Sequence, residues 1–173
     1  MTIDATPKHG SLEPVADKWR LVFRRRLPHT PEKVWQAIVE AEHRDTWFPQ
    51  RVEGEWRPGA VLKFISEYGD FEGKLLAFEP PSLVEFQWGT DVIRMEVRPD
   101  GNGTLFTLSD TFAEQGKAAR DAAGWHVCID ALEAELAGTR DTGETSSRWK
   151  PLFAEYVAKL GPNAATIGPP PKP

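Results

Sequence analysis

The segment GWHVCIDALEAELAG, residues 124–138, places a histidine and a cysteine two positions apart, and these are side chains from which a nucleophile and its general base can be built. Apolar residues recur along the segment at helical spacing, which predicts a helix. At about 100° per residue, His126 and Cys128 then project in directions about 160° apart. They cannot form a compact nucleophile–base pair on this helix, although a distant partner for either residue stays open.

One side of this helix, extended back to Ala118, is apolar along its length. His126 lies near the edge of that side, and Cys128 within it is interpreted as a small buried hydrophobic residue. The pattern therefore predicts a helix face packed on another layer, formed by Asp121, Ala122, Trp125, Cys128, Ile129, Leu132 and Leu136.

Gly124 is out of place inside such a helix, because glycine costs a helix interior about 1 kcal/mol relative to alanine. Close approach of another backbone, or room for a neighbour beside the Trp125 indole, would compensate for that cost.

Other signs of catalysis or metal binding are weak. The four histidines, at positions 9, 29, 43 and 126, have neither the spacing nor the cysteine partners of a metal site. Neither a glycine-rich phosphate loop nor a Gly-x-Ser-x-Gly elbow occurs. We therefore expect no metal and no cofactor, and we do not expect an enzyme.

Composition narrows the class of protein. The 173 residues are 40% apolar and 27% charged, with a formal charge of −5. This predicts one domain with appendages and disfavours nucleic acid as a partner, since nucleic-acid-binding proteins usually carry a basic excess.

The Arg24–Arg26 run is interpreted as a solvated strand with Arg25 at the sheet margin. A single cysteine, no signal pattern and no apolar run near ~20 residues predict a cytoplasmic protein without a membrane span.

The order of elements follows from periodicity. Alternation predicts a strand over 19–27, and Thr30 followed by Pro31 and Glu32 predicts a helix start, with a second short helical turn over 42–47. Short turns then separate strands over 61–68, 71–79, 83–88, 92–98 and 104–112, which favours antiparallel hairpins. The long helix ends at Gly138, and residues 148–160 form one more amphipathic helix.

Four segments are predicted. Residues 1–17 are a flexible arm, residues 18–138 are the folded domain, residues 139–161 are a linker with the extra amphipathic helix, and residues 162–173 are a disordered proline-rich tail.

Several short matches, in this order and spacing, resemble the START-like (SRPBCC) superfamily, specifically its Hsp90-ATPase-activator-like branch. They cover about residues 19–138 and comprise Pro31-Glu32-Lys33-Val34-Trp35, Trp47-Phe48, Gly59 with Phe64, Gly73, Phe78-Glu79-Pro80-Pro81, Val84-Glu85-Phe86-Gln87-Trp88, Thr104 with Leu108, and Gly124-Trp125 with Leu132 and Leu136.

The resemblance implies an α+β helix-grip (START/Bet v 1-like) fold. In that fold a curved antiparallel sheet wraps around a long C-terminal helix, with two short helices; the helix after residue 148 is extra. Relatives use the cavity between sheet and helix for lipids, polyketides or other apolar molecules. Some relatives are cyclases, and the namesake domain stimulates a chaperone ATPase.

Polar residues on the covered faces need an explanation, and two of them, Asp121 and Tyr68, are the candidates for fixing a ligand. Asp121, Asp110 and Tyr68 all share a side with buried apolar residues, so each lies either at a rim or beside a partner. We predict non-catalytic binding of an apolar or aromatic, lipid- or polyketide-like molecule. The predicted cavity residues are Phe64, Tyr68, Trp88, Met95, Asp121, Trp125 and Ile129.

Two other functions stay open. The chain could be an interaction module whose helix Trp149–Leu160 binds a chaperone or a second copy, although packing of that helix on its own domain is favoured. A cyclase-like enzyme is the other alternative, with the Asp121 carboxylate as acid or base. Periodicity alone does not distinguish a filled interior from a hollow one.

Overall fold

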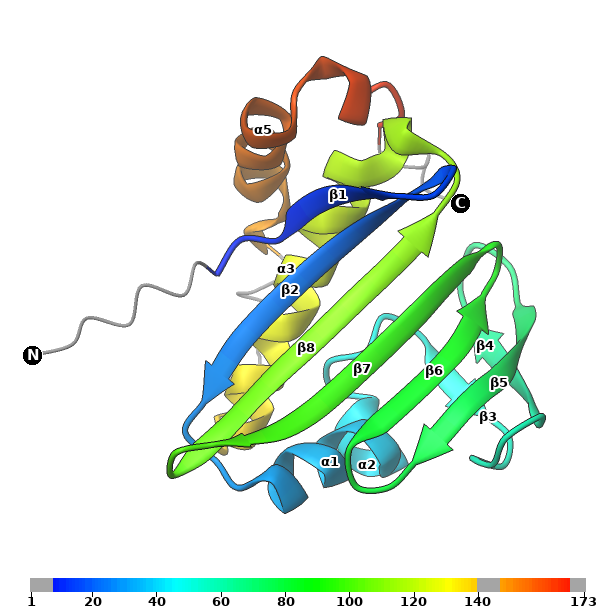
Figure 1. Ribbon diagram of the computed structural model, residues 1–173, viewed down its shortest axis with the longest axis vertical. Coiled ribbons are helices and arrows are strands. Elements are labelled where there is room, and N and C mark those ends of the chain that lie inside the picture. The colour runs from blue at the N-terminus through cyan, green and yellow to red at the C-terminus, as the bar shows by residue number, and fades with distance from the viewer. Residues whose placement is uncertain (1–7, 140–146, 169–173) are drawn as a thin grey trace, which may run out of the picture.

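A computed structural model describes residues 8–139 and 147–168 (Figure 1). Its strands are β1 (Ser11–Val15), β2 (Lys18–Leu27), β3 (Arg51–Glu53), β4 (Val61–Ile65), β5 (Phe71–Glu79), β6 (Leu83–Trp88), β7 (Asp91–Asp100) and β8 (Gly103–Phe112). Its helices are α1 (Pro31–Val39), α2 (Ala41–Arg44), α3 (Ala118–Leu136) and α5 (Trp149–Leu160), with short 3₁₀ turns η1 (Gln115–Lys117) and η2 (Pro162–Ala164). None of the helices in these two ranges is both long and apolar enough to span a membrane.

The strands form one sheet in the order β1-β2-β8-β7-β6-β5-β4-β3, with every neighbouring pair antiparallel. The long helix α3 lies behind this sheet, and α1 and α2 lie at its lower end in Figure 1. This arrangement confirms the predicted helix-grip α+β fold. The outer face of the sheet stays open to solvent, so the strands alternate between apolar and polar residues.

The first helix begins as its sequence predicts. The Thr30 hydroxyl accepts a hydrogen bond from the Lys33 amide, and Pro31 and Glu32 occupy the first turn. Val34 and Ile38, four positions apart, are then fully buried. The helix therefore closes the lower end of the layer between α3 and the sheet.

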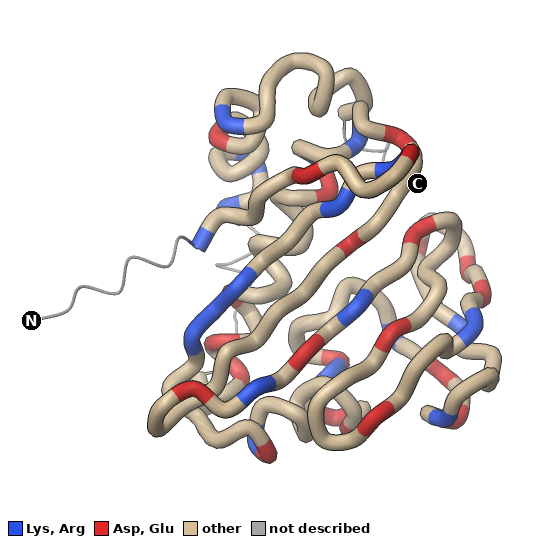
Figure 2. The backbone as a smooth tube through the Cα atoms, viewed as in Figure 1, with Lys and Arg blue, Asp and Glu red and all other residues tan. Residues whose placement is uncertain are grey.

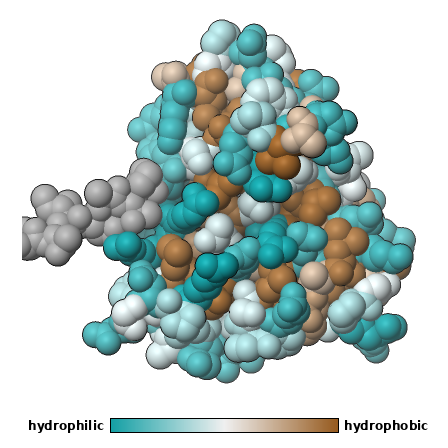
Figure 3. Space-filling model, viewed as in Figure 1, coloured by the Kyte–Doolittle hydropathy of each residue, from teal (hydrophilic) through white to brown (hydrophobic). Residues whose placement is uncertain are grey.

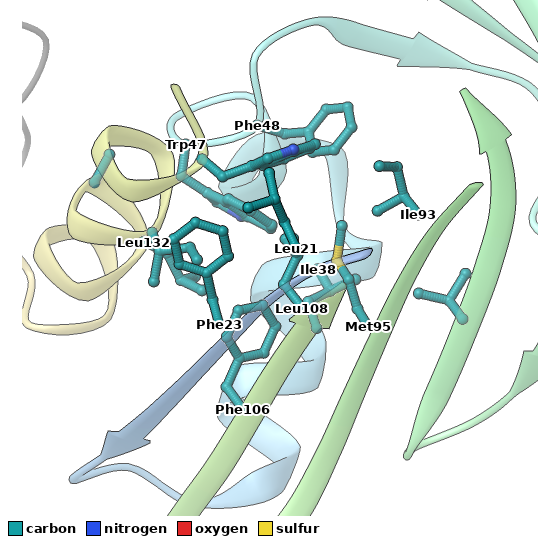
Figure 4. Close-up of a cluster of buried hydrophobic side chains, with 14 of the residues drawn as sticks. Leu21, Phe23, Ile38, Trp47, Phe48, Ile93, Met95, Phe106, Leu108 and Leu132 are labelled. Atoms are coloured by element: carbon teal, nitrogen blue, oxygen red, sulfur yellow. The ribbon is translucent and has the colours of Figure 1, made fainter. Parts of the chain in front are cut away.

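The interior between sheet and helix is filled with side chains. Met95 of β7 pairs with Leu108 of β8, and both are buried because alternate residues of each strand face α3. Figure 4 shows Phe23, Phe106 and Leu132 meeting in this layer. Burial of such side chains contributes roughly 1.5–3 kcal/mol each, so this layer is the main source of stability.

Arg25 departs from the prediction of a sheet-margin residue. It shares the inner face of β2 with Leu21 and Phe23, and its side chain is only 3% exposed. Its Nη1 donates to Asp130 and Glu133 of α3, at 2.9 Å each. The basic run is visible as the blue stretch of β2 in Figure 2. An arginine inside the layer is retained because two carboxylates compensate its charge.

The predicted flexible arm contains a strand. Ser11–Val15 pairs with β2 from Ser11↔Val22 to Val15↔Lys18, so residues 11–15 belong to the sheet, while residues 1–7 lie outside the described ranges. This strand is difficult to predict from the sequence because it contains Pro14, and proline argues against a strand except at the edge of a sheet. β1 is an edge strand, the place in a sheet where proline is tolerated.

The helix α5 packs on α3 rather than standing free. Leu152 and Tyr156 are buried in the common core, and the Tyr156 hydroxyl accepts the Gly10 amide at 2.8 Å. The chain after α5 continues against the domain through η2, where Ala164 is fully buried. Of the predicted tail, residues 162–168 are therefore ordered, and residues 169–173 lie outside the described ranges, as do residues 140–146 of the predicted linker.

Candidate functional site

A small pocket opens between the first half of α3, the end of β6 and the residues that follow α2. Its volume is about 120 Å³. We call it the Trp88–Trp125 pocket, and it is lined by Pro49, Trp88, Arg120, Asp121, Gly124, Trp125 and Cys128.

Two indoles form adjoining sides of this pocket, and both are held in place. The ring centroids of Trp88 and Trp125 are 5.2 Å apart with an interplanar angle of 49°. The Trp88 Nε1–H donates to Gln50 Oε1 at 2.9 Å, and the Trp125 Nε1–H donates to Asp110 Oδ2 at 3.0 Å. Because both polar edges are already bonded to protein, the ring carbons are left to face the pocket. This is a rigid aromatic surface prepared before any ligand arrives.

Gly124 leaves space on the helix side of the pocket. A Cβ built at this position would meet a single heavy atom within 4 Å, the Trp149 Nε1 at 4.0 Å. No close backbone contact within the described ranges therefore requires glycine here. The helix gives up about 1 kcal/mol at this position, and the structural result is open volume beside Trp125.

The polar side of the pocket is an arginine–aspartate pair. Arg120 Nε donates to Asp121 Oδ1 at 2.9 Å, and Lys117 Nζ lies 3.5 Å from Asp121 Oδ2. Burial raises the pKa of Asp121, and the two cations act against that rise. The pair places one strong hydrogen-bond donor, the guanidinium, beside an otherwise apolar surface.

Cys128 lines the same pocket but is not prepared for nucleophilic chemistry. Burial raises the pKa of its thiol to about 12, so the sulfur stays protonated at neutral pH. His126 lies elsewhere, with its Nδ1 2.8 Å from the Tyr156 hydroxyl on the α5 side of α3. The helix geometry therefore separates the two residues as predicted, and Cys128 serves as a weakly polar surface.

Behind the pocket lies a cluster of three aspartates. Carboxylate oxygens of Asp91, Asp110 and Asp121 lie within 4.8 Å of one another, and Lys117 Nζ donates to Asp91 Oδ1 at 2.6 Å. Oxygen atoms of this kind are ligands for Mg²⁺ or Ca²⁺. Here, however, the Lys117 ammonium already provides the positive charge among them. The arrangement therefore fits an internally balanced ionic cluster better than a metal centre.

A proton on Asp110 completes the charge balance of this cluster. Asp110 is fully buried, and its pKa is raised well above the usual range by burial and by the neighbouring Asp91 charge. Asp110 Oδ1 and Asp91 Oδ2 are buried and meet no N–H or hydroxyl donor in the described ranges. A neutral Asp110 gives both of these oxygens a partner. Its protonated oxygen donates to Asp91, while its other oxygen accepts from Trp125.

A larger hollow, of about 510 Å³, lies on the outer face of the sheet. Figure 3 shows this face as hydrophilic residues mixed with scattered apolar ones. Its charged side chains largely pair with each other, as Arg94 does with Glu85 and Glu96. Such a surface is typical of a solvated sheet face, so the Trp88–Trp125 pocket is the stronger candidate site.

Comparison with known proteins identifies the family. Residues 28–137 match the model of the Activator of Hsp90 ATPase homolog 1-like proteins. The chain belongs to the Activator of Hsp90 ATPase homolog 1-like family. This confirms the resemblance read from the sequence motifs. No curated protein sequence matches the chain.

Solved structures share the fold of this Activator of Hsp90 ATPase homolog 1-like chain. EF2215 from Enterococcus faecalis, a conserved protein of unknown function, is 18% identical with a TM-score of 0.75, covering 87% of this chain and 90% of its own. CalU16 from Micromonospora echinospora is 20% identical with a TM-score of 0.71, covering 90% and 98%. The BPP1335 protein from Bordetella parapertussis is 23% identical with a TM-score of 0.64, covering 88% and 91%.

The residues predicted to line a cavity separate into two groups in this family member. Trp88, Asp121 and Trp125 come together in the pocket. Phe64, Met95 and Ile129 are completely or almost completely buried in the filled core.

Tyr68 lies apart from both groups. It is 54% exposed, because β4 ends at Ile65 and the chain turns before Tyr68 can continue the covered side.

Sequence reasoning missed Pro49 and Arg120 on the pocket surface, and Asp91 and Lys117 behind it. Asp91 directly follows the Gly89-Thr90 turn and lies just before the strand predicted over 92–98, so no strand face was assigned to it. Gly124 was the one available signal, since a glycine inside a strongly periodic helix indicates packing or function.

Proposed function

We propose that this chain binds a small apolar or aromatic molecule in the Trp88–Trp125 pocket without catalysing a reaction on it. The observation that carries the proposal is Gly124, where the helix has no side chain and, among the residues that the structure describes, only Trp149 Nε1, at 4.0 Å, comes near the place of a Cβ. Local rules of helix formation are broken in natural proteins mainly where function requires it.

The volume supports a ligand of about one ring. Cavities near 150 Å³ lined by apolar side chains accept benzene, whereas drug-sized ligands occupy pockets of about 300–1,000 Å³. At about 120 Å³, the pocket favours a single-ring molecule over the lipid- or polyketide-like ligands that the family resemblance implied. The two fixed indoles favour an aromatic ring, which can contact their faces at an offset.

The chemistry of the pocket surface supports binding rather than turnover. The Cys128 thiol is protonated, and the Asp121 carboxylate already accepts from Arg120. A general base must be free to take a proton from substrate, and Asp121 is held in an ion pair instead.

Replacing Gly124 with larger residues tests the proposal. Gly124→Ala should stabilise the fold by about 1 kcal/mol, because the new Cβ meets only the Trp149 Nε1 at 4.0 Å. It should also weaken binding of small aromatic molecules, and Gly124→Leu should abolish it by filling the pocket. Stability is read from urea unfolding, and binding from quenching of tryptophan fluorescence.

Ala158→Leu is the matched control, since it adds the same side chain at an exposed position of α5. It should leave binding unchanged. If Gly124→Leu binds aromatic probes as tightly as the wild type, the pocket is not the binding site.

A further inference from the structure

The guanidinium of Arg120 has unused hydrogen-bonding capacity at the pocket. Its Nε donates to Asp121 Oδ1, but Nη1 and Nη2 make no hydrogen bond to any part of the chain that the structure describes. The side chain lines the pocket and is 26% exposed, so it is accessible both to a ligand there and to solvent. A guanidinium in this position presents a pair of parallel N–H donors, the geometry that matches a carboxylate.

Asp121, by contrast, has little capacity left. Its side chain is 13% exposed, one oxygen accepts from Arg120, and the other lies 3.5 Å from the Lys117 ammonium. A ligand ammonium would have to compete with two protein cations for this carboxylate. The polar side of the pocket therefore offers free donors and no comparably free acceptor.

We propose that the Trp88–Trp125 pocket takes a small aromatic carboxylate, whose ring lies against the two indoles and whose carboxylate accepts hydrogen bonds from the Arg120 Nη groups. This inference rests on the proposed function and names the class of ligand. The bidentate geometry specifies Arg120, because Lys117 is already directed at Asp91 and Asp121.

Local charge is compatible with an added anion. Lys117 and Arg120 face the carboxylates of Asp91 and Asp121, and the neutral Asp110 adds no charge. The ligand carboxylate therefore meets a balanced set of charges rather than a net negative site. Its own attraction to Arg120 is strengthened by the partial exclusion of water from the pocket.

The test compares three single-ring probes of similar size. Benzoate, benzamide and benzylamine are titrated into the full chain at pH 7 and low salt, with affinity measured by calorimetry and location by the indole N–H signals of Trp88 and Trp125 in NMR spectra. Benzoate should bind about tenfold or more tightly than the other two, because a charge-assisted bidentate pair is stronger than a neutral hydrogen bond.

Two variants test whether Arg120 is the residue that causes the preference for benzoate. Arg120→Gln should weaken benzoate about tenfold and leave benzamide within about twofold, since only the charged pair is lost. Asp121→Asn removes the carboxylate that an ammonium probe would pair with and nearly keeps the side-chain shape, so it should reduce any binding of benzylamine. Circular dichroism establishes that both variants are folded before titration.

The outcomes separate the two proposals. If all three probes bind alike and Arg120→Gln leaves benzoate unchanged, the carboxylate inference is overturned while the binding function stands. A benzylamine preference that Asp121→Asn removes would also overturn it. If none of the probes shifts either indole signal, the proposed function itself fails.

Discussion

Asp91→Asn should destabilise the protein by about 3 kcal/mol at pH 7. Asp110→Asn, in the same cluster, should instead leave the protein at least as stable as the wild type, because asparagine needs no proton to be neutral in the folded state. Asp91 is the ionised partner of Lys117, with 2.6 Å between Nζ and Oδ1, and both side chains are largely removed from solvent. Breaking a buried ion pair by removing one partner leaves the other charge uncompensated.

Asp110 behaves differently because the fold holds its neutral form. The asparagine amide reproduces a protonated carboxyl group: its oxygen accepts from the Trp125 Nε1–H, and its NH₂ donates to Asp91. Urea unfolding followed by tryptophan fluorescence measures both variants. An equal loss of stability in the two would mean that Asp110 is ionised in the native state.

The pH dependence of the same pair follows from the direction of the pKa shift. The pKa of Asp110 is higher in the folded state than its ordinary value of 3.8. Its contribution to stability is therefore fully present below that value and is lost as pH rises through the folded-state pKa. The free energy of unfolding of the wild type, relative to Asp110→Asn, should thus increase as the solution becomes more acidic.

His126 should produce the opposite dependence and the second large effect. Burial lowers its pKa from 6.5 to about 4. The neutral imidazole is favoured by the fold, so its contribution is complete above pH 6.5 and is lost as pH falls to about 4. At 1.36 kcal/mol per pKa unit, this amounts to about 3 kcal/mol.

The surroundings of His126 explain why the neutral form is favoured. Its Nδ1 lies 2.8 Å from the Tyr156 hydroxyl, which itself accepts the Gly10 amide, so the hydroxyl proton is free to point at the imidazole. Arg25, His9 and Arg148 also oppose a charge on the ring, and Asp130 alone favours it.

The measurement is the difference in unfolding free energy between the wild type and His126→Asn, from pH 7 to pH 4. Asparagine keeps a polar group near the Nδ1 position but does not titrate. The aspartate cluster titrates alike in both proteins and cancels. The difference should fall by about 3 kcal/mol; a difference that stays flat with pH would mean that burial of His126 has no linkage to folding.

Strand positions were predictable because alternation is local. Ile93, Met95 and Val97 are all buried, as their spacing indicated, and the intervening Arg94 and Glu96 face outward. The same alternation also places Arg25 and Asp110 on the inner face. What sequence could not supply was their partners, since Asp130 lies 105 positions from Arg25 and Trp125 lies 15 from Asp110.

The pocket was predictable only in part. Asp121 and Trp125 share a helix face, and Trp88 lies on the covered side of its strand, so these three could be chosen from periodicity. Arg120 lies one residue outside that face, and Pro49 comes from an irregular segment with no period at all. Whether the space between the layers is filled depends on side-chain volumes across different elements, and that information has no local pattern.

The contact between Tyr156 and Gly10 joins residues 146 positions apart, and Lys159 adds a second bond to the Gly10 carbonyl oxygen at 3.0 Å. A ribosome delivers these groups in a fixed order, so the first strand emerges long before the helix that fastens it. During synthesis β1 can first pair with its neighbour β2. The other neighbour of β2 in the sheet is β8, which is made much later. Helix α5, made more than a hundred residues after β1, thus completes the edge of the sheet, and non-local closure of this kind is a slow step for a growing chain.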